Sequence, residues 1–143
     1  MDFLETVYDP ISRIPAYEVP SDSKEVLILI PQSEDHQLTI ILFSKMLDRL
    51  GYAMADKCHV LSIVPLHRYF YHQLIHDFGF NKLILCGISP EILGLQSALP
   101  IHIPVHLDGT FLLRTDAPGL LEKSDANHKG AFWHAFKSAF GQW

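Results

Sequence analysis

Residues 26–30 read Val-Leu-Ile-Leu-Ile, and no other feature of the sequence constrains the fold as strongly. A strand with one face in water alternates apolar and polar residues, whereas a strand that is covered on both faces is apolar throughout. Residues 60–64 and 82–86 form two further short apolar segments, and each is followed by a proline or a glycine. These segments therefore predict the central strands of a parallel sheet with helices on both of its faces.

Helical patterns separate the predicted strands. Residues 33–50 carry apolar residues on one face, with Ser33 as the expected N-cap and Gly51 as the stop signal. The last helix, residues 125–140, is capped by Ser124 and places three phenylalanines at intervals of four residues. We expect further helices at 66–78, 89–95 and 117–123 and a fourth strand at 101–107. The sequence thus predicts an α/β fold, a three-layer α/β/α sandwich around a mainly parallel sheet of about four strands.

The first 24 residues differ in character from the rest of the chain. Prolines at positions 10, 15 and 20 prevent a continuous helix there. We interpret residues 1–24 as an extended arm and residues 25–143 as a single domain, because a chain of 143 residues matches one domain of ordinary size. The arm either packs on the domain or docks a partner protein. Its apolar residues are Phe3, Leu4, Tyr8, Ile11, Ile14 and Tyr17.

Composition and charge exclude several classes of protein. The chain is 48% hydrophobic and 19% charged, which excludes an intrinsically disordered protein. Its net charge of −5 disfavours sequence-independent binding to the phosphate backbone of nucleic acids. The N-terminus has acidic residues where a signal peptide has basic ones, and no apolar run approaches the ~20 residues that cross a membrane. We therefore expect a cytoplasmic protein without a membrane anchor, in which Cys58 and Cys86 are buried free thiols.

The predicted parallel sheet also predicts where a ligand would bind. The crevice of such a sheet lies beyond the carboxyl ends of its strands. No loop there has the glycine pattern that holds a dinucleotide or a triphosphate, and no Gly-x-Ser-x-Gly presents a nucleophilic serine. These absences argue against nucleotide phosphate chemistry and against an α/β-hydrolase. The residues predicted to line the cleft are Pro31, Gln32, Ser33, Glu34, Asp35, Ser62, His67, Arg68, Gly87, Thr115, Asp116 and Pro118.

Nine histidines raise the question of a metal site. His72 and His76 have the i, i+4 spacing of a His-Glu-x-x-His motif, but a glutamine stands in place of its glutamate. His102 and His106 are expected to share one face of the predicted fourth strand. A zinc site also needs a third ligand, which the spacing does not supply. We expect no metal and no cofactor, and the alternative is a small-ligand or metal-binding domain that uses His67, His72 or His76.

The last third of the sequence has a distinctive order of residues. Residues 115–123 read Thr-Asp-Ala-Pro-Gly-Leu-Leu-Glu-Lys, and a helical segment with Trp133 and Lys137 follows. This order resembles the tail of the uracil-DNA glycosylase superfamily, which has Thr-aromatic-His-Pro-Ser, a Leu-Leu pair and a helix that contains tryptophan. Residues 82–94 are similar to the strand and short helix ahead of that tail, and residues 26–35 fall where the family has its first catalytic loop. The resemblance covers about residues 25–140 and implies the glycosylase fold.

The catalytic positions that the resemblance implies carry other residues here. The family's first loop is of the Gly-Glu-Ala-Pro-Gly type, whereas residues 31–35 contain no glycine. Ser62 stands where the family has the asparagine that reads the base. Ala117 falls at the histidine that stabilises the departing uracil anion, and Gly119 falls at the adjacent serine. Because alanine offers no hydrogen-bond donor to the leaving base, these differences imply a protein without glycosylase activity.

The superfamily also contains non-catalytic proteins, the psi subunits of the bacterial replicative polymerase clamp loader, which work by protein contacts. The sequence is similar to them in size, in its altered loops and in its N-terminal arm. The resemblance implies a psi-like DNA replication accessory module whose partner is a clamp-loader or other replisome component and whose residues 1–20 dock it. The alternative is a divergent DNA glycosylase that hydrolyses an N-glycosidic bond, with Glu34 or Asp35 placing the water.

Overall fold

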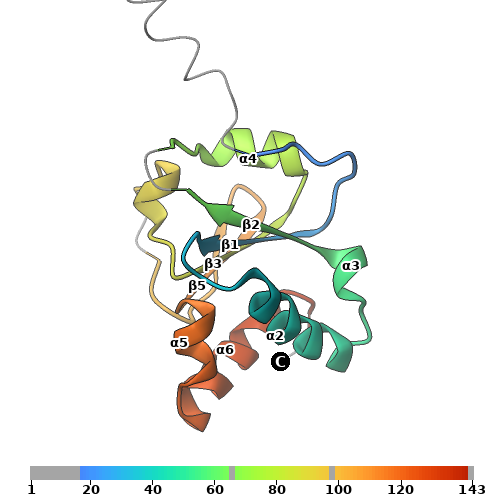
Figure 1. Cartoon of the computed structure of the whole chain (residues 1–143), viewed down its shortest axis with the longest axis vertical. Coiled ribbons are helices and arrows are strands. Elements are labelled where there is room, and N and C mark those ends of the chain that lie inside the picture. The colour runs from blue at the N-terminus through green and yellow to red at the C-terminus, as the bar shows by residue number, and fades with distance from the viewer. Residues whose placement is uncertain (1–16, 65–66, 97–98, 142–143) are drawn as a thin grey trace, which may run out of the picture.

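A computed structural model describes residues 17–64, 67–96 and 99–141 of the chain (Figure 1). The strands are β1 (Val26–Pro31), β2 (Cys58–Ile63), β3 (Lys82–Cys86), β4 (Val105–Leu107) and β5 (Thr110–Thr115). The helices are α2 (His36–Arg49), α3 (Met54–Lys57), α4 (Tyr71–Phe78), the 3₁₀ helix η1 (Pro90–Leu93), α5 (Pro118–Glu122) and α6 (Ala126–Ser138). Residues 1–16, which make up most of the predicted arm, lie outside the described residues.

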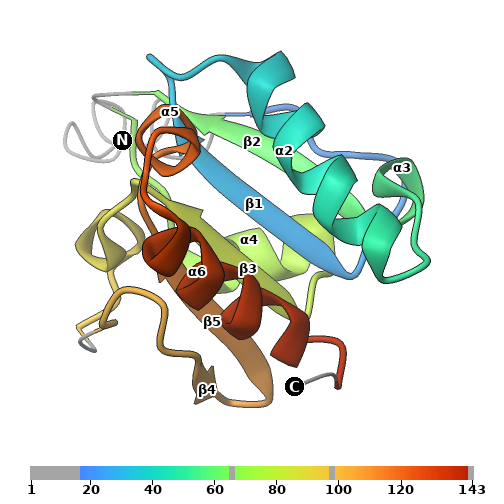
Figure 2. The same ribbon diagram turned by 90° about the horizontal axis from the view of Figure 1, so that it is seen from below.

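The sheet has the strand order β2-β1-β3-β5-β4, which can be followed across Figure 2. β2, β1, β3 and β5 pair in parallel, whereas β4 pairs antiparallel with β5 at one edge. The sheet is therefore mixed and has five strands, not four. The additional strand arises from a tight hairpin at Asp108-Gly109, where both residues have positive φ values of 49° and 81°. Two central residues with positive φ match the twist of the flanking strands, so the chain reverses there and β5 pairs with β4.

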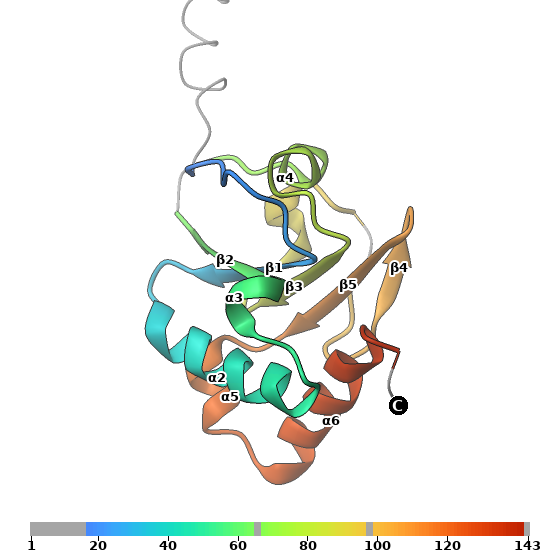
Figure 3. The same ribbon diagram turned by 90° about the vertical axis from the view of Figure 1, so that its right-hand side faces the viewer.

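Helices cover both faces of the sheet, which confirms the predicted three-layer sandwich (Figure 3). α4 and η1 lie on one face, and α2, α5 and α6 lie on the other. Alternate residues of the central strands enter two separate clusters, as period-two side chains must. The cluster beneath α2 and α6 includes Ile28, Ile30, Phe43, Leu47, Ile84, Leu113, Phe132 and Phe136. The cluster beneath α4 includes Leu27, Leu29, Tyr69, Leu74, Phe78, Leu83, Leu85 and Leu112.

The two cysteines belong to this core, and both are free thiols as predicted. Cys58 begins β2 and Cys86 ends β3, and each side chain is buried. Burial disfavours the charged thiolate and so raises the pKa of Cys58 to about 12, and it raises the pKa of Cys86 as well. Neither thiol is therefore a reactive nucleophile.

The predicted helix caps are shifted by one or two residues. Asp35, not Ser33, caps α2, because its carboxylate accepts hydrogen bonds from two amides of the first turn, at 2.9 and 3.3 Å. Asp125 caps α6 by accepting from the His128 N–H at 2.8 Å. Ser124, the predicted cap, instead donates its hydroxyl to a carbonyl of the preceding helix. In both cases the N-cap is an aspartate that lies one or two residues after the predicted serine.

Two predicted elements begin later than the sequence suggested. α4 begins at Tyr71 and not at residue 66, because Tyr69 is buried and its hydroxyl accepts a hydrogen bond from the Val64 N–H at 2.8 Å. The predicted strand 101–107 is reduced to the three residues of β4. His102 has a left-handed φ of 64°, and Pro104 has no N–H to donate to a ladder. His102 and His106 therefore do not share a strand face.

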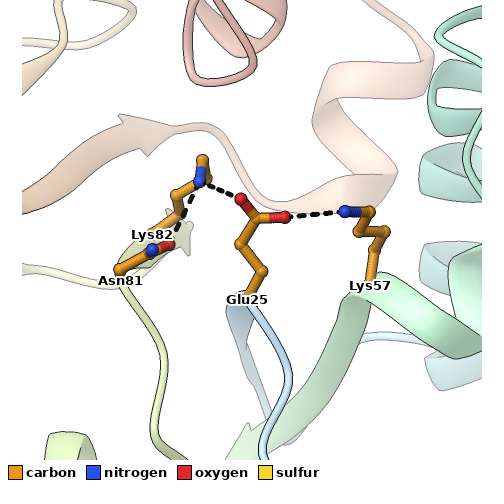
Figure 4. A network of polar contacts seen from close by, with 4 residues as sticks. All are labelled: Glu25, Lys57, Asn81 and Lys82. Carbon is orange, nitrogen blue, oxygen red and sulfur yellow. Dashed lines mark hydrogen bonds and ion pairs between the residues drawn. The ribbon is translucent and has the colours of Figure 1, made fainter.

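One carboxylate joins the amino ends of three neighbouring parallel strands, β2, β1 and β3. Glu25 directly precedes β1, and it binds Lys57 ahead of β2 and Lys82 at the start of β3 (Figure 4). The Lys57 Nζ–Glu25 Oε2 distance is 3.0 Å. Burial opposes ionisation of Glu25, but its hydrogen bonds to Lys82 and Lys57 outweigh this effect and lower its pKa below 4.5. This network lies at the amino ends of the strands, whereas the cleft is predicted at their carboxyl ends.

Tyr17 marks the point where the described chain meets the domain. Its ring stacks against Tyr69 and lies 5.3 Å from the ring centroid of Phe78, and its hydroxyl donates to Asp77 Oδ2 at 2.5 Å. Burial, reinforced by the Asp77 carboxylate, raises the pKa of Tyr17. Tyr17 therefore packs on its own domain. The other five apolar residues of the arm lie outside the described residues.

Candidate functional site

The carboxyl ends of β1, β3 and β5 lie side by side, because these strands are neighbours in the parallel part of the sheet. Just beyond β3, the Gly87 N–H donates to the Thr115 carbonyl at the end of β5, at 2.8 Å. Residues 31–35, Gly87 and residues 115–118 therefore meet at this edge, as the sequence predicts. These segments contain nine of the twelve residues that were expected to line the cleft.

Glu34 connects the loop after β1 to the start of α5. Its Oε1 accepts a hydrogen bond from the Gly119 N–H at 2.7 Å, across 85 residues of sequence. Gly119 is the second residue of α5, whose N-cap, Ala117, makes no side-chain hydrogen bond. The carboxylate of Asp116, the residue before Ala117, is hydrogen-bonded to His128 instead of to the start of α5. The Glu34 carboxylate thus serves the amide that a local cap would otherwise satisfy.

Gly87 and Ala117 approach each other closely at the centre of this edge. Gly87 has a φ of 76°, which favours glycine, and a Cβ built there would lie 2.7 Å from the Cβ of Ala117. A contact that short does not occur between real side chains. The position that the resemblance assigns to the leaving-group histidine is therefore held by a methyl group packed on a glycine.

The remaining three residues of the predicted cleft belong to β2 and the segment after it, and Ser62 lies beside the loop after β1, whose Gln32 N–H donates to the Ile63 carbonyl at 3.1 Å. Ser62 lies on β2 and pairs with Ile30. His67 and Arg68 are exposed in the segment ahead of α4, and in the described contacts neither is bonded to residues 31–35 or 115–119. The structure therefore brings together the loops of β1, β3 and β5 but not the basic residues that follow β2.

A cluster of two histidines and one aspartate lies at the carboxyl end of β5. His102, Asp116 and His128 each offer one ligand atom, and these atoms lie within 4.8 Å of one another. The His128 Nε2 is hydrogen-bonded to the Asp116 carboxylate, and the two imidazole rings meet edge to face with centroids 4.5 Å apart. Among the described residues this is the group of three that has metal-ligating geometry.

Neighbouring groups hold the cluster in place. The His102 Nε2 lies 2.8 Å from the hydroxyl of Thr115, which is 1% exposed. Its ring also lies 5.7 Å from the ring centroid of Phe132 on α6. Burial and the nearby His128 lower the pKa of His102, while the Asp116 carboxylate opposes this shift. A neutral imidazole, the form that this shift favours, has a lone pair on one ring nitrogen.

The sequence did not anticipate this cluster. It placed Asp116 in the cleft, but it assigned His102 to a strand face and gave no role to His128. The signal available in hindsight is that His128 lies three residues after the cap of α6, near the end of β5. The histidines that the spacing did single out lie elsewhere: His76 is bonded to Asp77 on α4, and the ring of His106 packs edge to face on Phe111.

Comparison with models of protein families, with curated proteins and with solved structures finds no significant match to this chain. Within the described ranges, every helix is too short or too polar to cross a membrane.

Proposed function

We propose that the chain is a non-catalytic protein-interaction module on a glycosylase-like scaffold and acts as a psi-like accessory subunit in DNA replication. The observation that carries the proposal is the hydrogen bond from the Gly119 N–H to Glu34 Oε1. In a glycosylase the acidic residue of the first loop faces the attacking water. Here that carboxylate is used to hold one loop of the edge to another.

The contact between Gly87 and Ala117 supports the same conclusion. Cleavage of an N-glycosidic bond needs a donor beside the leaving base, because negative charge develops there in the transition state. The methyl group of Ala117 supplies none, and its close packing on Gly87 leaves no room for a larger side chain at position 87. The divergent-glycosylase alternative would have to rely on Asp35, which caps α2.

The identity of the partner rests on the resemblance alone. In the psi subunits the N-terminal arm docks the clamp-loader body, so residues 1–20 are the proposed docking segment here. Tyr17 packs on the domain through Tyr69 and Phe78, which supports a division of the arm into an anchored end and the preceding docking residues. The net charge of −5 favours a protein partner over a nucleic acid.

The direct test is binding of the purified full-length chain to a reconstituted bacterial clamp loader. We compare the wild-type protein with a triple variant, Leu4→Asp, Ile11→Asp and Ile14→Asp. The matched control is Ile41→Asp, which adds one charge at an α2 side chain that is 50% exposed. The proposal expects the control to bind like the wild type and the triple variant to bind at least about tenfold more weakly, since it removes three apolar anchors. Absence of binding by the wild-type chain would refute the proposal.

A further inference from the structure

We propose that His102, Asp116 and His128 form a binding site for one divalent transition-metal cation of the Zn²⁺ type. The three residues come from separate elements: the loop between η1 and β4, the segment after β5, and the first turn of α6. The inference goes beyond the proposed interaction function and does not depend on it.

The distances fit a mononuclear site. Zn²⁺ binds imidazole nitrogen and carboxylate oxygen at about 2.0–2.2 Å in tetrahedral geometry, which places the ligand atoms about 3.3 Å from one another. The three candidate atoms lie within 4.8 Å of one another, so side-chain shifts of about 1.5 Å or less suffice. His128 Nε2 and the Asp116 carboxylate already face each other across a hydrogen bond, so a cation would replace the shared proton.

The chemistry of the ligand set selects the class of cation. Two imidazoles and one carboxylate are the ligands of many zinc and iron sites, whereas Mg²⁺ and Ca²⁺ prefer oxygen ligands alone. All three residues are partly buried, which reduces competition from bulk water. The His128 side chain is 37% exposed, so water can reach the cluster and complete the fourth position.

The surroundings resemble the outer shell of a metal site. A ligating histidine is oriented in proteins by a hydrogen bond from its ring to an oxygen. The buried Thr115 hydroxyl lies 2.8 Å from the His102 Nε2 and fixes that ring. His102 itself adopts a left-handed φ of 64°. Such a conformation is uncommon for a residue other than glycine, and the His102 N–H there donates to the Arg114 carbonyl of β5 at 2.9 Å, which holds the residue beside the end of β5.

The test is a titration of the full-length chain, prepared without an affinity tag and freed of metal with a chelator. Zn²⁺ is added in competition with a chromophoric chelator, and Co²⁺ serves as a spectroscopic probe. The proposal expects one saturable equivalent of Zn²⁺, a tetrahedral Co²⁺ absorption spectrum without thiolate bands, and a higher melting temperature with Zn²⁺.

Variants separate this site from the other histidines. His128→Gln and Asp116→Asn each remove one ligand and should weaken Zn²⁺ binding by more than about 100-fold. Thr115→Val removes only the orienting hydroxyl and should weaken it by about tenfold, within the range for an outer-shell partner. His106→Gln, on β4, is the matched control and should bind like the wild type.

Melting of each variant without metal shows whether it folds, and the wild-type titration tests the proposal even if a variant does not. Three results would overturn the proposal. The first is the lack of a saturable single equivalent in the wild type, and the second is unchanged affinity in His128→Gln and Asp116→Asn. The third is a Co²⁺ spectrum with thiolate charge-transfer bands, which would assign the metal to a cysteine.

Discussion

Replacing Glu34 by alanine removes the hydrogen bond that joins the loop after β1 to the start of α5. The bond is charge-assisted and partly buried, with a length of 2.7 Å between Oε1 and the Gly119 nitrogen. Hydrogen bonds to charged groups contribute about 1.5–3 kcal/mol, and loss of a helix cap costs about 0.5–2 kcal/mol. Because water can reach part of this edge and replace the lost acceptor, we expect the free energy of unfolding to fall by about 1–2 kcal/mol.

Urea denaturation measures this change directly. With a slope of roughly 2 kcal/mol per molar urea, the midpoint should fall by about 0.5–1 M while the slope stays the same. Glu34→Gln keeps an acceptor oxygen but loses the charge, so it should lose about half as much. The control Glu122→Ala removes a carboxylate from an exposed position of α5, the helix that Glu34 contacts, and should stay within about 0.5 kcal/mol of the wild type.

The sign of the Glu34→Ala effect distinguishes the two roles of the residue. A carboxylate kept for catalysis is often unfavourable for stability, so its removal leaves stability unchanged or raises it. Removal of a carboxylate that holds the structure together lowers the free energy of unfolding instead. A midpoint for Glu34→Ala equal to or above that of Glu122→Ala would refute the assignment of Glu34 as a structural link.

Three further predictions follow from other parts of the structure. Gly87→Ala should lower the free energy of unfolding by about 2–4 kcal/mol, because alanine is strained at this positive φ and its Cβ clashes with Ala117. Gly94 has a similar φ but open space around it, so Gly94→Ala should lower it by only about 1 kcal/mol. Thermal or urea unfolding measures both changes. The pKa of Glu25 is lowered, so its pairing with Lys82 and Lys57 stabilises the fold above pH 4.5, and this stabilisation is lost as the pH falls through the lowered pKa. Glu25→Gln should therefore lower the free energy of unfolding by up to about 1 kcal/mol at pH 7. The difference from the wild type should shrink in unfolding curves near pH 3. Tyr17→Phe deletes the hydroxyl bonded to Asp77 and should cost about 1 kcal/mol, while Tyr52→Phe, for whose hydroxyl the described residues provide no hydrogen bond, should change stability by less than 0.5 kcal/mol.

The sequence predicts the central elements well because their signals are local. The apolar runs that become β1 and β3 need only the two-sided burial of a parallel sheet to explain them, and the phenylalanine stripe of α6 packs where its period places it. The start of α4 could not be predicted in the same way. It depends on the burial of Tyr69 and on its hydrogen bond with Val64, and both are tertiary contacts.

The candidate site also has one part that the sequence predicts and one part that depends on tertiary contacts. That the loops after β1, β3 and β5 meet at one edge follows from parallel topology, and the sequence predicts it. Which side chains bond across that edge depends on distances set by the whole fold. Neither the hydrogen bond between Glu34 and Gly119 nor the contact between His102 and His128 has a short-range signal, because these pairs are separated by 85 and 26 residues. The second contact also involves the left-handed φ of His102.

The central proposal, that the chain is a non-catalytic module on a glycosylase-like scaffold, is tested most directly by an assay for base release. Purified full-length protein is incubated at high concentration with single-stranded and double-stranded uracil-containing DNA, and free uracil and abasic sites are quantified. The account predicts no release above the protein-free blank, because Ala117 provides no donor to the leaving base and Glu34 is bonded to Gly119. Release of uracil by the wild-type protein that disappears in Glu34→Gln would contradict it.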